Sequence, residues 1–125
     1  MIVWLGKVAR SFLCASQGLR FLAREERNFR LHLLAAALAV AAAIGLGVSA
    51  MEWCLIVSCI GVVFCAEALN SAIEHLCDRV TPEREEAIRH IKDAAAAAVL
   101  CVSAASVIVG ALIFLPRLWM AFAGR

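Results

Sequence analysis

The residues of this chain with the clearest chemical potential are acidic side chains inside an apolar stretch, residues 53–77. Glu67 and Glu74 lie within it, and Asn70 and Asp78 continue the same spacing. Steps of three and four residues place these side chains on one face of a helix. A charged group near the bilayer centre costs about 2.5–3.5 kcal/mol, so such acids usually mark a site that has a partner or a water-filled cavity. The alternative is an interhelical hydrogen bond that serves packing alone.

Two further polar clusters precede the other apolar stretches. Glu26, Arg30 and His32 stand before the first, and Lys92 and Asp93 before the last. We expect Asp93 at the N-cap or in the first turn of a helix, where a negative charge is favourable. Lys92 would oppose the helix dipole at that place, and a bound polyanion would explain it.

These residue types could together carry out phosphoryl transfer, although other charge-handling sites use the same groups. Paired carboxylates can hold Mg²⁺ jointly with substrate phosphates. A further carboxylate can accept the proton of an attacking hydroxyl, and cations can neutralise the transferring oxygens. The residues alone therefore indicate a membrane site that handles charge, and they do not name the reaction.

The composition requires these residues to be positioned by membrane helices. Of 125 residues, 64% are hydrophobic and 18% charged, and the mean hydropathy is +0.89. A soluble domain has roughly 45–50% apolar and about 25% charged residues. Three stretches, residues 33–50, 53–77 and 94–115, approach or exceed the ~18–20 residues that cross a bilayer. We therefore predict one all-α integral-membrane domain over residues 1–125 with three transmembrane helices.

The first 31 residues are predicted to form an amphipathic surface helix, because basic side chains lie opposite an apolar stripe. This helix is either a plain membrane anchor or one that also borders a site. Most lysines and arginines fall in residues 1–32 and 78–93. By the positive-inside rule these segments are cytoplasmic, which places the amino terminus inside and the carboxyl terminus outside.

The motif Glu67-Ala-Leu-Asn70-Ser71-Ala-Ile-Glu74, with Asp78 and the later Lys92-Asp93-Ala-Ala-Ala-Ala-Ala, resembles the signature of the prokaryotic diacylglycerol kinase family. Residues 26–32 resemble the first motif of that family. The resemblance implies a small lipid kinase of the bacterial cytoplasmic (inner) membrane. Such enzymes are homotrimers with active sites shared between subunits. They transfer the γ-phosphate of ATP, bound with Mg²⁺, to a lipid hydroxyl.

The resemblance also implies roles for particular residues. Glu67 matches the general base, and Glu26 and Glu74 match metal-binding carboxylates. The residues expected to bind the substrate or the nucleotide are Asn70, Lys92, Asp93, Arg30, His32 and Asp78. The acceptor stays open between diacylglycerol, which gives phosphatidic acid, and undecaprenol, which gives undecaprenyl phosphate.

Two other classes of protein are compatible with acids in a membrane helix. A small multidrug transporter also uses an embedded glutamate, but it needs four spans and a single acid near the midplane. A non-catalytic membrane assembly subunit is the second alternative. Three predicted spans and a cluster of acids beside Lys92 favour the kinase.

Overall fold

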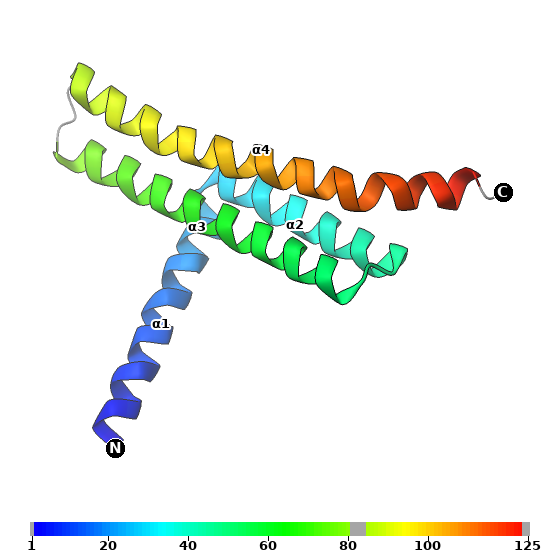
Figure 1. Cartoon of the computed structure of the whole chain (residues 1–125). Coiled ribbons are helices and arrows are strands. Elements are labelled where there is room, and N and C mark those ends of the chain that lie inside the picture. The colour runs from blue at the N-terminus through cyan, green and yellow to red at the C-terminus, as the bar shows by residue number, and fades with distance from the viewer. Residues whose placement is uncertain (1, 81–84, 124–125) are drawn as a thin grey trace.

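The computed structural model of the chain describes residues 2–80 and 85–123, and it consists of four α-helices with no strand in these residues (Figure 1). The helices are α1 (Ile2–Glu25), α2 (Arg27–Leu46), α3 (Ala50–Val80) and α4 (Glu86–Ala123). The predicted all-α class is therefore confirmed.

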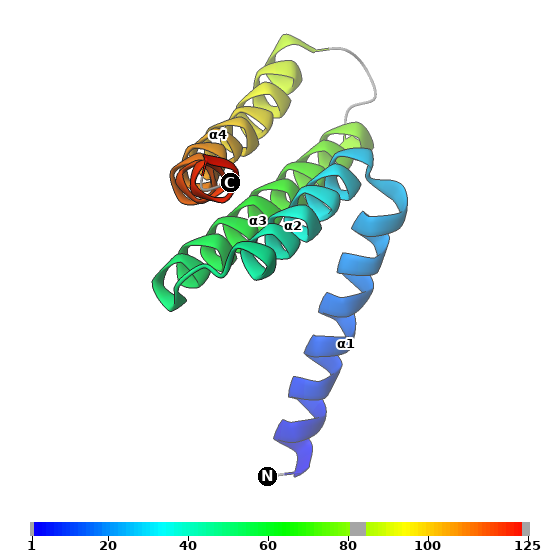
Figure 2. The same cartoon turned by 90° about the vertical axis from the view of Figure 1, so that its right-hand side faces the viewer.

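Helices α2, α3 and α4 form an elongated bundle, and α1 leaves it at a steep angle (Figures 1 and 2). Helix α3 lies against both α2 and α4. All three helices of the bundle are long and apolar enough to cross a membrane, which agrees with the three predicted spans. Large apolar side chains such as Leu38, Leu69 and Leu112 are exposed on the bundle, as expected of surfaces that meet lipid.

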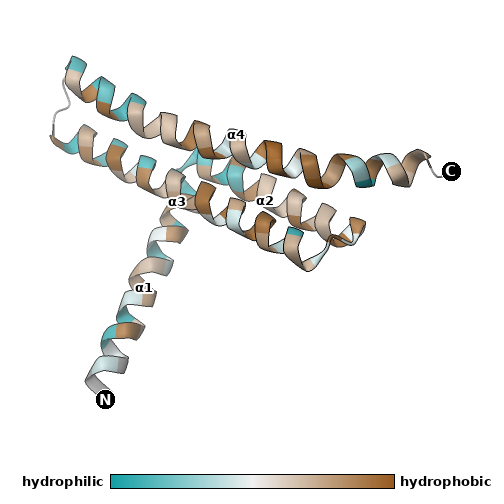
Figure 3. Cartoon of the chain, in the orientation of Figure 1, coloured by the Kyte–Doolittle hydropathy of each residue, from teal (hydrophilic) through white to brown (hydrophobic). Residues whose placement is uncertain are grey.

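Polar residues gather at one end of the bundle, around the start of α2, the end of α3 and the start of α4 (Figure 3). The amphipathic helix α1 joins the bundle near this end, and its Leu22 is buried there. The chain turns sharply between α1 and α2 at Glu26, whose backbone is extended (φ −92°, ψ 114°). The surface helix therefore ends at Glu25, earlier than the predicted limit of residue 31.

The first spanning helix ends at Leu46 instead of the predicted residue 50. Gly47 adopts the left-handed conformation (φ 60°), which glycine enters without a Cβ clash. Its N–H and that of Val48 bond back to carbonyls of the last turn, and Val48 packs with Ala43 in the core. These features form a Schellman cap, which satisfies the free carbonyls of the helix end.

The last helix begins at Glu86, so the prediction that Asp93 lies at the N-cap or in the first turn was wrong. Asp93 is the eighth residue of α4, well past the unpaired N–H groups of the first turn. The polar segment before the alanine run is helical because arginine, lysine and glutamate are good helix formers. The polar residues of this segment are mostly exposed but belong to the helix, so their polarity does not mark where the helix begins.

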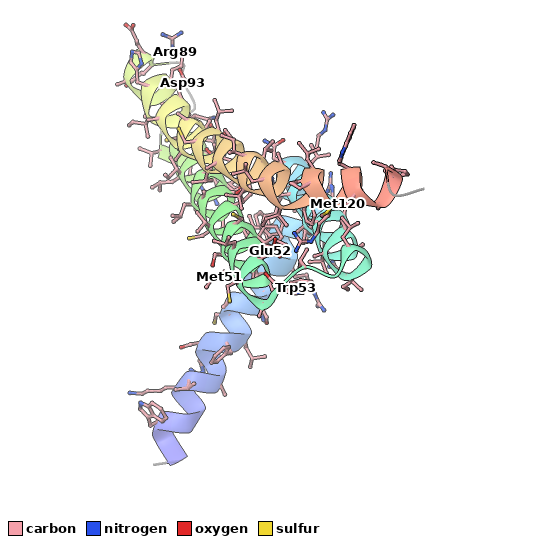
Figure 4. All side chains as sticks on the ribbon, turned by 45° about the vertical axis from the view of Figure 1, so that its right-hand side comes forward. Met51, Glu52, Trp53, Arg89, Asp93 and Met120 are labelled. Atoms are coloured by element: carbon pink, nitrogen blue, oxygen red, sulfur yellow. The ribbon has the colours of Figure 1, made fainter. Side chains whose placement is uncertain are left out.

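The opposite end of the bundle is closed by an ion pair between α3 and α4. Arg117 donates from Nη1 to Oε1 of Glu52 (2.5 Å) and from Nη2 to Oε2 (2.7 Å). Ser49 donates to the same Oε2 from its backbone N–H and from its hydroxyl, both at 2.7 Å. Glu52 thus completes a capping box at the start of α3 while it also binds α4. It lies far from Arg89 and Asp93 along the bundle (Figure 4).

We expect the substitution Arg117→Met to lower the thermal stability of the protein in detergent micelles. The side chains of Arg117 and Glu52 are only 26% and 21% exposed, so the carboxylate would lose two charged hydrogen bonds in a partly desolvated place. Hydrogen bonds to charged groups are stronger than those between neutral groups. Thermal unfolding followed by circular dichroism measures the effect. Arg20→Met, an exposed position on α1, is the control, and equal stability of the two variants would contradict a stabilising role.

Candidate active site

Helix α3 presents its polar face to the interior of the bundle, as its spacing predicts. Glu67, Asn70 and Ser71 are buried, with exposures of 2%, 6% and 2%. The Oδ1 atom of Asn70 is buried and accepts no hydrogen bond within the described residues. Along the same face Glu74 is half-buried and Asp78 is exposed. The polar face therefore runs from the interior of the bundle at Glu67 out to its surface at Asp78.

Three other titratable residues lie close enough to Glu67 to act on its carboxyl group electrostatically. The largest of these interactions is with His32 on α2, followed by Glu74 and Glu26. Glu26 is positioned by the turn between α1 and α2, and Glu74 lies two helical turns beyond Glu67 on α3. Elements that are distant in the sequence thus bring three predicted site acids and a predicted histidine together.

A histidine without a predicted role holds Glu26 in this cluster. Nε2 of His75 lies 2.8 Å from Oε1 of Glu26, and an N–H at this ring position donates a hydrogen bond to the carboxylate. The ring of Phe21 on α1 lies against the His75 ring, with centroids 5.6 Å apart. This contact fixes the turn between α1 and α2 against α3. The only sequence signal for it is that His75 directly follows Glu74.

Lys92 pairs with Asp78 across the ends of α4 and α3. Its Nζ atom lies 2.9 Å from Oδ1 of Asp78, and Glu74 also acts on it electrostatically. The unfavourable helix dipole that suggested a bound polyanion is absent, because Lys92 lies beyond the first turn of α4. The pair connects Lys92 to the acids of α3 instead.

Arg30 and Asp93 are less closely joined to the cluster. Arg30 is exposed, and its Nη1 donates to the carbonyl oxygen of Arg24 at 2.5 Å, at the end of α1. Asp93 is exposed on α4, at the same end of the helix as Arg89 (Figure 4). Arg30 thus contacts the end of α1, and Asp93 lies near the start of α4.

The donor set of this site fits Mg²⁺ bound together with phosphates. Within residues 2–80 and 85–123, no three histidine, cysteine or acidic side chains converge as a complete metal site. Magnesium usually keeps several waters and takes one or two carboxylates plus substrate phosphates. Glu26 and Glu74 are the two carboxylates that would hold the ion in such an arrangement.

The sequence profile described as prokaryotic diacylglycerol kinase matches residues 13–114, a range that contains every residue of the site. The chain belongs to this family. Among curated members of the prokaryotic diacylglycerol kinase family, the undecaprenol kinase of Bacillus subtilis (strain 168) is 40% identical over 91% of this chain and 93% of its own. The diacylglycerol kinase of Escherichia coli (strain K12) is 37% identical over 85% and 84%.

Membership of the prokaryotic diacylglycerol kinase family confirms the resemblance drawn from the motifs. The protein is a lipid kinase of the diacylglycerol or undecaprenol type, and its reaction is nucleotide-dependent phosphoryl transfer. A transporter or a non-catalytic assembly subunit is not favoured. The three apolar helices agree with an integral-membrane member of this family.

Proposed function

We propose that the protein transfers the γ-phosphate of ATP, bound with Mg²⁺, to the hydroxyl of undecaprenol or diacylglycerol at the cytoplasmic face of the bacterial inner membrane. The observation that carries this proposal is the buried carboxyl group of Glu67 within an apolar helix, beside Glu26, Glu74 and His32. A carboxyl group inside a membrane helix costs free energy, so its presence indicates a function. A general base that receives a proton from a membrane-bound substrate would need this location.

In this mechanism Glu67 accepts the proton of the lipid hydroxyl while the hydroxyl oxygen forms its bond to the γ-phosphorus. The bond between that phosphorus and the oxygen that bridges to the β-phosphate breaks, and ADP leaves. Asn70, one helical turn from Glu67, has a free Oδ1 that can orient the hydroxyl. Phosphoryl transfer is accelerated mainly by such positioning and by compensation of charge.

Glu26 and Glu74 would hold Mg²⁺, which would neutralise charge on the phosphates. Because His75 occupies Oε1 of Glu26, the other oxygen of that carboxylate is left for the metal. Lys92 is anchored by Asp78, yet an ammonium group has three donors and can direct the others to phosphate. Arg30, His32 and Asp93 complete the proposed contacts with ATP and the lipid.

The positive-inside distribution of cations supports a cytoplasmic amino terminus and an extracytoplasmic carboxyl terminus. We also propose a homotrimer with shared sites. An exposed stripe on α3 supports this assembly, because Leu55, Val62, Leu69 and Leu76 recur every seven residues and are 45–63% exposed. Such a seven-residue repeat is typical of helices that pack together with a left-handed twist. A trimer would close the polar end of the bundle around the nucleotide.

The proposal is tested by giving purified protein [γ-³²P]ATP, Mg²⁺ and either undecaprenol or diacylglycerol in mixed micelles. We expect radioactive phosphate in at least one lipid after thin-layer chromatography, and its loss when EDTA removes Mg²⁺. Protein without lipid is the control for hydrolysis of ATP. Label in neither lipid would contradict the proposed function.

A further inference from the structure

A cavity of about 320 Å³ lies between α2, α3 and α4, inside the membrane-spanning part of the bundle. Its lining is mostly aliphatic and aromatic, and His32, Ser103 and Ser106 are its polar side chains. The hydroxyl of Ser106 already donates to the carbonyl oxygen of Val102 (2.8 Å). The hydroxyl of Ser103 is buried and has no hydrogen-bond partner within the described residues, so the cavity presents one unpaired hydroxyl among largely apolar walls. Apolar cavities stay dry and bind apolar molecules.

One end of the cavity lies about one helical turn from the proposed base, Glu67. Val63 and Phe64 line it and stand about one turn before Glu67 on α3, and His32, which interacts with Glu67, lines it from α2. From Val63 it extends to Ile56, a distance of about 10 Å along the helix. Ile56 is part of the buried core, which closes that end. The cavity thus runs along α3 from about one turn before Glu67 to the buried core around Ile56.

On its α4 side the pocket reaches the outer surface of the single chain. Val107 of α4 lines it and is 71% exposed. Four of its lining residues are small, Ala35, Ala36 and Ala39 on α2 and Gly110 on α4. Small residues in membrane helices usually let helices approach each other closely. Here they leave room that an apolar chain from the bilayer can enter.

We propose that this pocket holds the hydrocarbon chain next to the acceptor hydroxyl, and that it takes the single chain of a polyprenol. The inference rests on the proposed function, because it requires the hydroxyl to lie at Glu67. The volume lies at the lower end of the range of about 300–1,000 Å³ for small-molecule sites, which suits one chain better than two acyl chains on a glycerol. The 40% identity to an undecaprenol kinase agrees with this assignment.

The first test is photo-cross-linking with a polyprenol that carries a diazirine on the isoprene unit nearest the hydroxyl. We expect mass spectrometry to find the label on pocket residues such as Ala39, Phe64 and Val107. Unlabelled undecaprenol in excess should remove this label, whereas diacylglycerol should compete weakly. Label confined to Leu34 and Leu38, which are exposed and do not line the pocket, would overturn the proposal. Equal competition by diacylglycerol would overturn the choice of a polyprenol.

The second test fills the pocket with Ala39→Leu and uses the ratio of kcat/KM for undecaprenol to that for prenol, its single-unit analogue. We expect the ratio to fall about tenfold, because a pocket shaped for a chain tolerates added methyl groups poorly. Ala37→Leu is the matched control, since Ala37 is exposed on the same helix and does not line the pocket. A ratio that Ala39→Leu leaves unchanged, or that both variants lower equally, would overturn the proposal.

The two failures are distinguishable. If the wild-type protein phosphorylates no lipid, the proposed function fails. If it phosphorylates undecaprenol while cross-linking and the Ala39→Leu ratio exclude the pocket, only the chain site fails.

Discussion

Replacing Glu67 by glutamine should lower lipid phosphorylation about 10²–10⁴-fold, the usual contribution of a positioned general base. The amide cannot accept the proton of the lipid hydroxyl, yet it has nearly the size of the carboxyl group and keeps the buried contacts. Removing a charge from a 2% exposed position should also leave the fold intact or stabilise it. The measurement is the initial rate of transfer of ³²P from ATP to lipid at saturating Mg²⁺.

Glu25→Gln provides a matched control for this prediction. Glu25 is an exposed acid at the end of α1, directly before Glu26, and it has no role in the proposed mechanism. The control should retain wild-type activity, and circular dichroism should show the same helix content for both variants. Substantial turnover by Glu67→Gln would refute the assignment of Glu67 as the base.

Glu26→Gln and Glu74→Gln should each raise the Mg²⁺ concentration needed for half-maximal activity by at least about tenfold. Loss of a residue that only hydrogen-bonds to a metal ligand typically weakens metal affinity 10–100-fold. Loss of a ligand itself should weaken it at least as much. Titration of activity with Mg²⁺ at fixed ATP measures the shift. Excess Mg²⁺ should restore part of the rate, because the base Glu67 is still present.

The same titration separates metal binding from other roles of these acids. Glu25→Gln again serves as the control, since it removes an equal charge next to Glu26. A variant whose rate falls at every Mg²⁺ concentration without a shift in the midpoint would act on the reaction in another way. That outcome would remove Glu26 or Glu74 from the metal site while leaving the assignment of Glu67 untouched.

The different burial of the three acids explains why Glu67 should respond differently from Glu26 and Glu74. Glu67 lies inside the bundle, whereas Glu74 is half-buried and Glu26 occupies the turn at the bundle's polar end. In the proposed mechanism a lipid hydroxyl would approach Glu67 from the bilayer, and a nucleotide would approach Glu26 and Glu74 from water. The two substrates would therefore meet along one face of α3.

The sequence by itself determined the class of the fold and the face of α3 that carries Glu67, Asn70 and Glu74. Long apolar stretches allow few structures besides helices, because a bilayer cannot satisfy free backbone groups. The spacing of Glu67, Asn70 and Glu74 fixes their common direction, since it follows from the period of the helix. The motifs around these residues also indicated the family that the sequence comparisons confirmed.

Tertiary structure decided which distant residues meet. The contact of His75 with Glu26, the pair of Lys92 with Asp78, and the pair of Arg117 with Glu52 all join different helices. The apolar pocket, which ends about one turn from Glu67, likewise exists only because three helices pack around it. Helical periodicity gives the direction of a side chain from its own helix. It does not give the rotation or the axial shift of the helix that lies opposite, and these depend on the packing of all the side chains between them.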